Sequence, residues 1–341
     1  MRAIVLHEPR DLRIDERERP TPGPGQVSVK IERGGICGSD LHYYRHGGFG
    51  TVRMREPLTL GHEIAGRVVE HGAGVSAPAL GTLVAVNPSM PCGQCEFCRA
   101  GQRIHCIDMR FLGSAMRFPH VQGGFAEYVV APAENAVPVA ADADAGLAAF
   151  AEPLAVCLHA ASRAPIYGSR VMVMGAGPIG ALLTLVARFG GAREIVVTDV
   201  LEAPLQLVGS IGADRTVNVS EPDALSEFEG RKGYFDVVFE AAGQASTVPG
   251  ALRVTRPGGT IVLVGQGATA ELPVSSVVTK EVDLRGSFRF DNEFGLAVDL
   301  LGARRIDVAP LLTDTLPISE AVAAFELAAD KSRSMKLQLA F

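Results

Sequence analysis

The sequence predicts a two-domain α/β protein, in which a β-rich first domain precedes a parallel sheet covered by helices on both faces. Short apolar runs at residues 171–174, 195–197, 237–239 and 261–264 alternate with longer helical stretches. Short, fully apolar strands separated by helices indicate a buried parallel sheet. Earlier in the chain, polar and apolar residues alternate instead, as at residues 26–31, which is the period of a half-buried strand.

The order of the remaining elements follows from the same patterns. The composition changes near Asp144, and residues 146–164 are rich in Ala and Leu, which predicts a helix that Pro153 interrupts. Two further helix-like segments occupy residues 293–304 and 319–331. The sequence closes with an alternating strand at residues 336–341.

Composition restricts the class of protein. The 341 residues are 47% hydrophobic and 21% charged, as in soluble globular domains. A formal net charge of -6, with no dense Lys/Arg run, disfavours nucleic acid and anionic membranes as partners. The opening apolar run is too short for a secretory signal, and residues 171–187 are interrupted by glycines and too few for a membrane span. We therefore expect a cytoplasmic protein.

A glycine-rich turn follows the first strand of the predicted parallel sheet. Gly175, Gly177 and Gly180 form a G-x-G-x-x-G pattern between an apolar run and an apolar helix, which is the context that a dinucleotide-binding turn requires. The first glycine permits the tight turn, the second lets the backbone approach a pyrophosphate, and the third lets the helix pack on the strand. The helix N-terminus then offers free N–H groups to the phosphates.

Asp199 ends the next apolar strand and indicates which dinucleotide is bound. A carboxylate there accepts hydrogen bonds from the ribose hydroxyls of NAD and repels the 2′-phosphate of NADP. No Lys or Arg follows it before Arg215. NAD is therefore favoured over NADP; the alternative hypothesis is a glycine turn that binds nothing.

Four cysteines crowd into one short segment with the spacing Cys92-x2-Cys95-x2-Cys98-x7-Cys106. Four thiolates can close a tetrahedral zinc site with no open position, which would be structural. A bacterial ferredoxin cluster is the alternative, but its fourth cysteine follows after three residues and precedes a proline. Cys157 stands alone in an apolar stretch and is interpreted as a buried small hydrophobe.

Three separate fragments carry the residue types of a second, open metal site. They contain Cys37, the pair His62 and Glu63, and Glu152. A catalytic zinc takes three such ligands and keeps one position open. Each residue also has an ordinary interpretation, as a core cysteine, a surface histidine or a glutamate at a helix terminus. Sequence spacing alone does not bring these fragments together.

Taken in order, these motifs resemble the zinc-containing medium-chain dehydrogenase/reductase superfamily. The resemblance rests on residues 34–42 (GGICGSDLH), 61–63 (GHE), the four-cysteine segment, 151–155 (AEPLA) and 175–180 (GAGPIG), and it covers essentially the whole chain. It implies a GroES-like catalytic domain at residues 1–148 and a Rossmann NAD-binding domain at residues 149–286. Residues 287–341 would return to complete the first domain.

Within the superfamily the chain resembles the polyol dehydrogenases. The shared strings are His42-Tyr43-Tyr44, FLGSAMRFPHVQGG at residues 111–124, KGYFDV at residues 232–237 and LRGSFRF at residues 284–290. This resemblance implies a small polyhydroxylated substrate, either a polyol or an aldonate. It also implies a homo-oligomer, with a tetramer favoured.

The resemblance assigns roles residue by residue. Cys37 and His62 match two ligands of a catalytic zinc, and either Glu63 or Glu152 completes the set. Ser39 and His42 match a proton relay. The other assignments concern the cofactor, which would contact Gly175, Gly177, Pro178, Ile179, Gly180, Asp199, Val264, Gly265, Phe288 and Arg289.

Two zinc ions per chain and NAD, with NADP as the alternative, are therefore the expected cofactors. Arg289 would also lie near the substrate, and Arg110, Arg117 and Arg289 are candidates to meet an aldonate carboxylate. A non-catalytic NAD-binding protein on the same fold is the competing hypothesis, because fold alone does not imply function. A zinc-free quinone reductase would lack the metal-binding residues.

Overall fold

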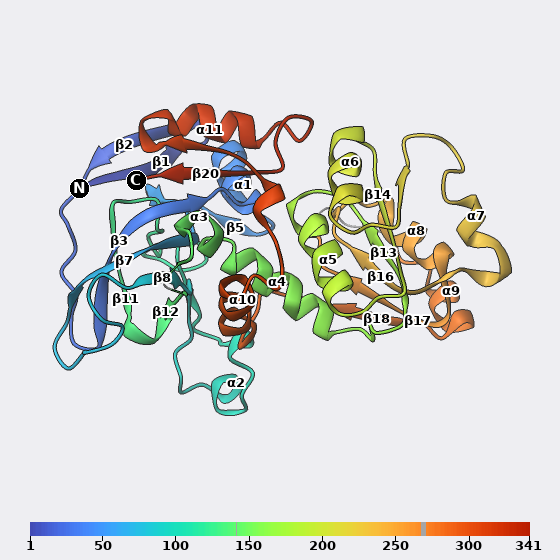
Figure 1. The fold of residues 1–341 in the computed structure, drawn as a ribbon, viewed down its shortest axis with the longest axis horizontal. Helices are drawn as coiled ribbons and strands as arrows, with labels where there is room; N and C mark the ends of the chain where they lie inside the picture. Colours follow the sequence, from blue (N-terminus) through green and yellow to red (C-terminus); the bar gives the residue numbers. More distant parts are fainter. Residues whose placement is uncertain (141, 267–270) are drawn as a thin grey trace. The chain divides into compact units, whose positions relative to one another are not determined.

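The computed structural model describes residues 1–140, 142–266 and 271–341, which form two compact units (Figure 1). Unit 1 consists of Met1–Glu152, Asp291–Asp330 and Lys336–Phe341. Unit 2 consists of Pro153–Phe290 and Lys331–Met335. Unit 1 is thus discontinuous in sequence, and the end of the chain contributes to it.

Unit 2 contains the predicted parallel sheet. Its six strands lie in the order β15-β14-β13-β16-β17-β18, and all neighbours are parallel. The order reverses between β13 and β16, which is where doubly wound sheets bind their ligands. The strands are β13 (Arg170–Met174), β14 (Glu194–Asp199), β15 (Arg215–Asn218), β16 (Phe235–Glu240), β17 (Thr255–Leu263) and β18 (Asp283–Gly286).

Helices cover this sheet on two sides, because each parallel connection must cross a face of the sheet. Figure 1 shows α5 and α6 on one side and α8 and α9 on the other. The helices are α5 (Pro178–Phe189), α6 (Glu202–Ser210), α7 (Ser226–Glu229), α8 (Thr247–Val254) and α9 (Val274–Lys280). The prediction of a doubly wound parallel sheet is confirmed.

Unit 1 is mostly β-structure around a seven-stranded sheet with the path β12-β8-β7-β3-β20-β19, and β11 also pairs with β3. Buried aliphatic side chains and rings such as Phe125 and Phe325 fill its core. The strands are β3 (Gln26–Gly35), β7 (Glu63–His71), β8 (Leu83–Val86), β11 (Tyr128–Pro132), β12 (Ala136–Pro138), β19 (Leu312–Pro317) and β20 (Lys336–Ala340). A separate sheet has the order β2-β1-β6, from β1 (Arg2–Glu8), β2 (Asp11–Glu16) and β6 (Leu58–Thr59).

Short helices complete unit 1. They are α1 (Gly38–His46), α2 (Glu96–Arg99), α3 (Ala145–Ala148), α10 (Glu293–Gly302) and α11 (Ala321–Ala328), with the 3-10 helix η1 at Arg103–His105. The short strands β9 (Ser89–Met90) and β10 (Arg110–Phe111) pair beside the cysteine segment.

The break in the Ala-rich helix does not fall where the sequence predicts it. The chain forms α3, passes through two turn residues at Ala149 and Phe150, and resumes as α4 (Ala151–Ser162). Pro153 lies in the first turn of α4, where the missing N–H has no intrahelical acceptor and costs nothing. The stretch Ala145–Ser162 is long and apolar enough to cross a membrane by length and composition, but 72% of it is buried inside the protein, as in a core helix.

The glycine turn before α5 allows a test of how closely this helix packs against the turn. A Cβ on Gly180 would lie 1.7 Å from the backbone oxygen of Gly175, whereas a Cβ on Gly177 would meet nothing within 4 Å. Gly180→Ala should therefore lower the free energy of unfolding by about 1–3 kcal/mol through overpacking. Gly177→Ala, the matched control, should cost about 1 kcal/mol or less, through the weaker N-cap preference of alanine. Urea unfolding of both variants measures the difference, and equal losses would contradict the packing role of Gly180.

Candidate metal centres and cofactor site

Strand pairing in unit 1 brings Cys37, His62 and Glu63 together. Cys37 is the second residue after β3, and Glu63 is the first residue of β7, which pairs with β3 so that Gly35 faces Glu63. A Cys37 sulfur, a His62 nitrogen and a Glu63 oxygen all lie within 4.8 Å of one another. We call these residues the Cys37–His62–Glu63 group.

The buried carboxylate of Asp40 ties the two ligand-bearing segments to each other. Its Oδ2 accepts a hydrogen bond from the Cys37 backbone N–H at 3.0 Å, and its Oδ1 accepts one from the Gly61 N–H at 3.2 Å. The same Oδ1 lies 3.7 Å from Nδ1 of His62. Asp40 therefore fixes Cys37 and His62 relative to each other, in the way that outer carboxylates orient metal-binding histidines.

Burial and neighbouring charges shift the pKa values of ionisable residues in and beside the group. Burial, reinforced by the charge of Glu63, raises the pKa of the Cys37 thiol to about 12. Burial also raises the pKa of Glu152 to about 8, against the opposing effect of His62. Burial works to lower the pKa of Lys336, but the interaction with acidic neighbours, Glu63 first, outweighs it and raises that pKa. A dication would favour the deprotonated forms, because metal ligands bind as thiolate and carboxylate.

The donor set fits zinc. Sulfur, imidazole nitrogen and carboxylate oxygen are the three zinc ligand types. Nδ1 of His62 is buried and has no hydrogen-bond partner among the residues that the structure describes. Leaving a buried polar atom unpaired costs free energy of folding, which a bound metal ion at this nitrogen would offset. Glu152 is buried in the first turn of α4 but is not a member of the group.

The expected relay residues both lie on α1. Ser39 is in its first turn, and its hydroxyl hydrogen-bonds with the Cys37 thiol. His42 is exposed one turn later, with its ring centroid 6.2 Å from that of His46.

Sequence reasoning missed Phe111, whose ring centroid lies 5.5 Å from that of His62. It missed Asp40 too, although the position three residues after Cys37 is the capping-box position of α1.

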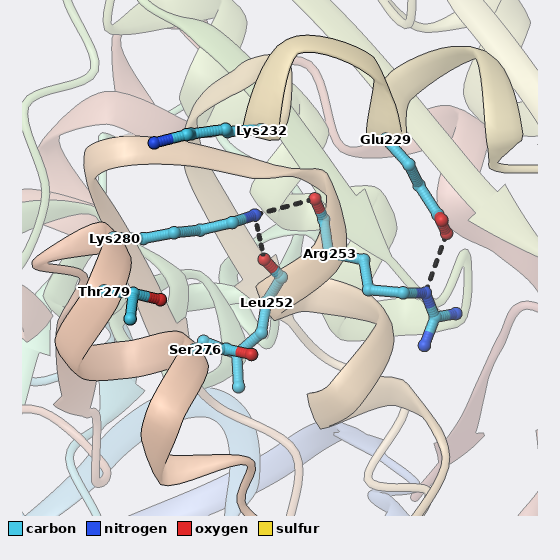
Figure 2. Close-up of a pocket in the computed structure, with 7 residues that line it drawn as sticks. All are labelled: Glu229, Lys232, Leu252, Arg253, Ser276, Thr279 and Lys280. Carbon is cyan, nitrogen blue, oxygen red and sulfur yellow. Dashed lines mark hydrogen bonds and ion pairs between the residues drawn. The ribbon is translucent and has the colours of Figure 1, made fainter.

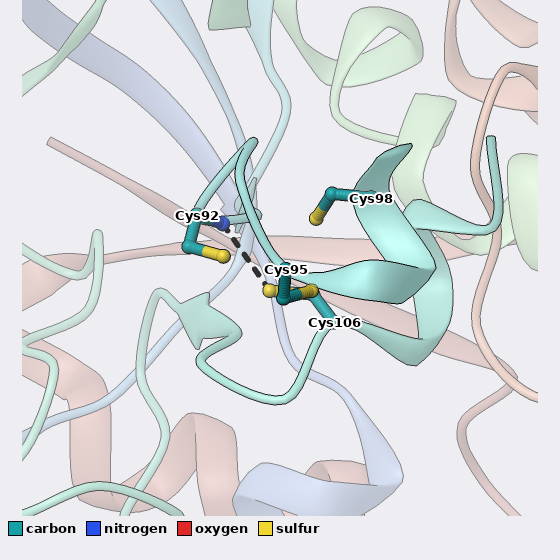
Figure 3. A group of neighbouring side chains, drawn as sticks. All are labelled: Cys92, Cys95, Cys98 and Cys106. Carbon is teal, nitrogen blue, oxygen red and sulfur yellow. Dashed lines mark hydrogen bonds between the residues drawn. The ribbon is translucent and has the colours of Figure 1, made fainter. Parts of the chain in front are cut away.

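The four cysteines of the second motif also converge, as Figure 3 shows. Cys92, Cys95, Cys98 and Cys106 are free thiols whose sulfur atoms lie within 4.8 Å of one another. The Cys92 N–H donates to the Cys106 sulfur at 3.2 Å, and N–H groups of Cys98 and Ile107 lower the pKa of Cys95 to about 6. A set of four thiolates suits a structural zinc and leaves no position for a substrate.

The side chain of Arg117 binds to the cysteine lobe (residues 92–109). Its guanidinium donates to the backbone oxygens of Ile107 and Met109 and lies 3.5 Å from Asp108. Arg110 is exposed on β10. Its neighbour Phe111 faces His62, and successive side chains of a strand point to opposite faces.

In unit 2 the expected cofactor residues gather at the carboxyl end of the parallel sheet. Gly175 has a φ of 99° and follows β13, and Gly177 is the N-cap of α5. Oδ2 of Asp199 accepts a hydrogen bond from the Ala176 N–H at 2.8 Å. The acid at the end of β14 is therefore joined to the glycine turn.

The remaining cofactor candidates follow neighbouring strands of the same sheet. Val264 and Gly265 come after β17, and both donate their N–H groups to the backbone oxygen of Glu240 at 2.9 Å. Phe288 and Arg289 come after β18, and the Arg289 guanidinium lies 4.9 Å from the centroid of the Phe288 ring. The backbone of Arg289 has a φ of 50°, which is uncommon for a residue with a side chain.

A separate pocket of about 430 Å³ in unit 2 contains none of these residues (Figure 2). Lys280 Nζ donates there to the backbone oxygens of Leu252 and Arg253, and the Arg253 side chain pairs with Glu229. These charges are satisfied by the protein, so the pocket gives no indication of a ligand.

The chain is similar to known dehydrogenases. The family profile of the alcohol dehydrogenase GroES-like domain matches residues 23–141, and that of zinc-binding dehydrogenases matches residues 178–303. L-idonate 5-dehydrogenase (NAD(P)(+)) of Escherichia coli (strain K12) is 46% identical over 315 residues, which are 92% of this chain and 91% of that protein. Sorbitol dehydrogenase of Gallus gallus is 36% identical over 330 residues, 95% of this chain and 92% of that protein.

A solved structure is similar over the whole chain. The crystal structure of L-idonate 5-dehydrogenase from Escherichia coli str. K-12 substr. MG1655 matches with a TM-score of 0.95 and 43% sequence identity. The match covers 100% of this chain and 98% of that one.

Variants of single cysteines test whether the two groups bind one metal ion each, independently of one another. We expect two zinc ions per chain, and Cys98→Ser and Cys37→Ala should each lose one of them, because each removes a thiolate from a different group. Elemental analysis of the purified variants measures the loss. Cys157→Ala, which removes a thiol outside both groups, is the control and should keep both ions. Loss of both ions, or of neither, in the two test variants would contradict two independent sites.

Proposed function

Because the chain belongs to the zinc-binding dehydrogenases of the medium-chain superfamily, we propose that it is an L-idonate 5-dehydrogenase. The reaction would oxidise the C5 hydroxyl of L-idonate to the ketone of 5-keto-D-gluconate, with reduction of NAD(P)+ and release of a proton. The similarity to the Escherichia coli protein of that name, over 92% of this chain, supports the proposal.

The observation that carries the proposal is the convergence of Cys37, His62 and Glu63 from separate segments of unit 1. A non-catalytic dinucleotide-binding protein has no need of a buried sulfur, nitrogen and oxygen donor set. We take Glu63 as the third metal ligand, because its oxygen belongs to the group and Glu152 does not.

Each residue has a defined task in this scheme. The Cys37–His62–Glu63 group would hold a zinc ion that supplies Lewis acidity to a substrate hydroxyl, and unit 2 would hold a nicotinamide dinucleotide as the hydride acceptor. Ser39, beside Cys37, receives the hydroxyl proton on its oxygen and releases its own proton towards His42. His42 is exposed and passes that proton to water.

The coenzyme preference follows from Asp199. Its carboxylate accepts hydrogen bonds from the N–H groups of Ala176, Val200 and Leu201. A carboxylate has about four lone-pair sites, so capacity remains to accept a hydrogen bond from a ribose hydroxyl. Its charge would repel a 2′-phosphate, so we propose that NAD is preferred over NADP.

Sorbitol or xylitol is the second candidate substrate, because the sorbitol dehydrogenase of Gallus gallus is 36% identical. Sorbitol and xylitol are uncharged, whereas L-idonate carries a carboxylate. Arg117 is engaged by the cysteine lobe and Arg110 lies on the strand face opposite Phe111, so we propose Arg289 as the cation that meets an aldonate.

We also propose a cytoplasmic homo-oligomer, with a tetramer favoured. β18 is an edge strand of its sheet, and edge strands with free N–H and C=O groups pair readily with a second chain. Exposed apolar side chains precede that edge in sequence, at Leu272, Val274 and Val278. The native mass in solution, measured by light scattering, tests the tetramer.

A spectrophotometric assay tests the activity. Following NADH absorbance, we expect kcat/KM for L-idonate to exceed the values for sorbitol, xylitol and threonine. Cys37→Ala should reduce turnover by more than the roughly 100-fold loss that is typical of changes outside the ligand set. Preferred turnover of sorbitol would support the second candidate, and no turnover of any of these alcohols would sink the proposal.

A pair of arginine variants tests the carboxylate contact. Arg289→Ala should raise the KM for L-idonate at least about tenfold more than the KM for sorbitol, because a hydrogen bond to a charged group is worth roughly 1.5–3 kcal/mol. Arg117→Ala should change both KM values by the same factor, since its guanidinium contacts the lobe. A selective effect of Arg117→Ala on L-idonate would reverse the assignment.

A further inference from the structure

Glu63, a member of the candidate metal centre, forms a buried ion pair with Lys336. Lys336 is 4% exposed and Glu63 is 1% exposed. The Lys336 ammonium donates to Oε1 of Glu63 at 2.6 Å and also contacts Oε2 of the same carboxylate. It donates a further hydrogen bond to the backbone oxygen of Ile36 at 3.0 Å.

The Lys336 ammonium makes two hydrogen bonds and one further ionic contact. The backbone oxygen of Ile36 and Oε1 of Glu63 each accept one of its N–H groups. Oε2 of Glu63 is in ionic contact with the ammonium but accepts no hydrogen bond from the described residues. A charge buried in this way costs several kcal/mol unless it is paired, so the buried lysine depends on the Glu63 carboxylate.

The pair joins the segments that carry the ligands. Ile36 directly precedes Cys37, and Glu63 directly follows His62. Lys336 comes from β20, which pairs with β3 beside Gly34 and Gly35. Lys336 thus reaches across 273 residues of sequence to hold one candidate ligand and the residue before another.

A second neighbour also restricts the Glu63 carboxylate. A Cβ on Gly35 would lie 2.2 Å from Oε2 of Glu63, so only glycine leaves room for the carboxylate in its present position. The Gly35 backbone and the Lys336 ammonium therefore both confine Glu63, one of whose oxygens lies within 4.8 Å of the Cys37 and His62 donors.

We propose that Lys336 is a positioning residue of the metal centre, which fixes the plane of the Glu63 carboxylate and balances its charge before the metal arrives. This inference rests on the proposed function, because it takes Glu63 as the third ligand. A carboxylate already oriented needs no rearrangement when it binds the metal, and partners of this kind alter metal affinity or activity by about 10- to 100-fold.

The test combines three variants with cobalt as a spectroscopic probe of the same site. Lys336→Met removes the charge with little change in volume, Glu63→Gln removes the carboxylate, and the double variant removes both. Cobalt affinity is measured by competition with a chelator, and the visible spectrum of the bound cobalt reports its ligand geometry. Lys280→Met is the matched control, because Lys280 also donates to backbone oxygens but lies in unit 2.

We expect Lys336→Met to weaken cobalt binding at the catalytic site by about 10- to 100-fold and to change the cobalt spectrum. In the Glu63→Gln background the same substitution should change the affinity by less than about twofold, since a residue that acts only through Glu63 has no additive effect without it. Lys280→Met should leave both readouts unchanged. Lys336→Gln keeps a hydrogen-bond donor and replaces Lys336→Met if the latter does not fold.

An unchanged affinity and spectrum in Lys336→Met would overturn the inference. So would a loss of affinity that is equally large in the parent protein and in the Glu63→Gln background. Failure of the proposed function would look different. In that case the parent protein itself would bind no metal at the Cys37–His62–Glu63 group, and cobalt would be found only in the four-cysteine lobe.

Discussion

The geometry of the candidate site depends on the buried carboxylate of Asp40. Its two oxygens accept hydrogen bonds from the Cys37 and Gly61 N–H groups, which belong to different connections of unit 1. Burying this charge is costly, and the two backbone donors and the nearby His62 ring offset the cost. Lys336 forms a second link between the same segments, through Ile36 and Glu63. Two buried ionisable side chains thereby hold the three donor residues together.

The two cysteine environments differ in the donors that surround the sulfur atoms. In the lobe, backbone N–H groups lower the pKa of Cys95 to about 6, whereas burial and the neighbouring thiols raise the pKa of Cys98 to about 12. At Cys37, burial beside Glu63 raises the pKa to about 12. Metal binding therefore displaces a proton at both sites. The lobe offers four sulfur atoms, which close a tetrahedral site, whereas the Cys37–His62–Glu63 group offers three donors of different kinds.

Features set by neighbouring residues could be predicted from sequence, and features set by distant strand pairing could not. The glycine turn and the four-cysteine lobe each lie within one short segment, where spacing alone defines the chemistry. The meeting of Cys37 with His62 depends on the β3–β7 register and was reached only through family resemblance. Lys336 and Gln338 alternate with leucines, a pattern that places them on a solvent face. They are buried because other segments of unit 1 cover this face of β20: Lys336 contacts Glu63, and the Gln338 amide donates to the backbone oxygen of Gly146.

The position of β20 also has a consequence for the order in which the protein folds. Its residues follow Pro153–Phe290 of unit 2 in the sequence, yet they fill an interior place in the sheet of unit 1. On the ribosome that part of unit 2 is therefore synthesised before the strand that unit 1 needs, and domains generally fold as they emerge. A nascent chain that has not reached Lys336 lacks both an inner strand and the ammonium group that contacts Glu63. The first metal centre can therefore be assembled only after the greater part of the second unit has been made.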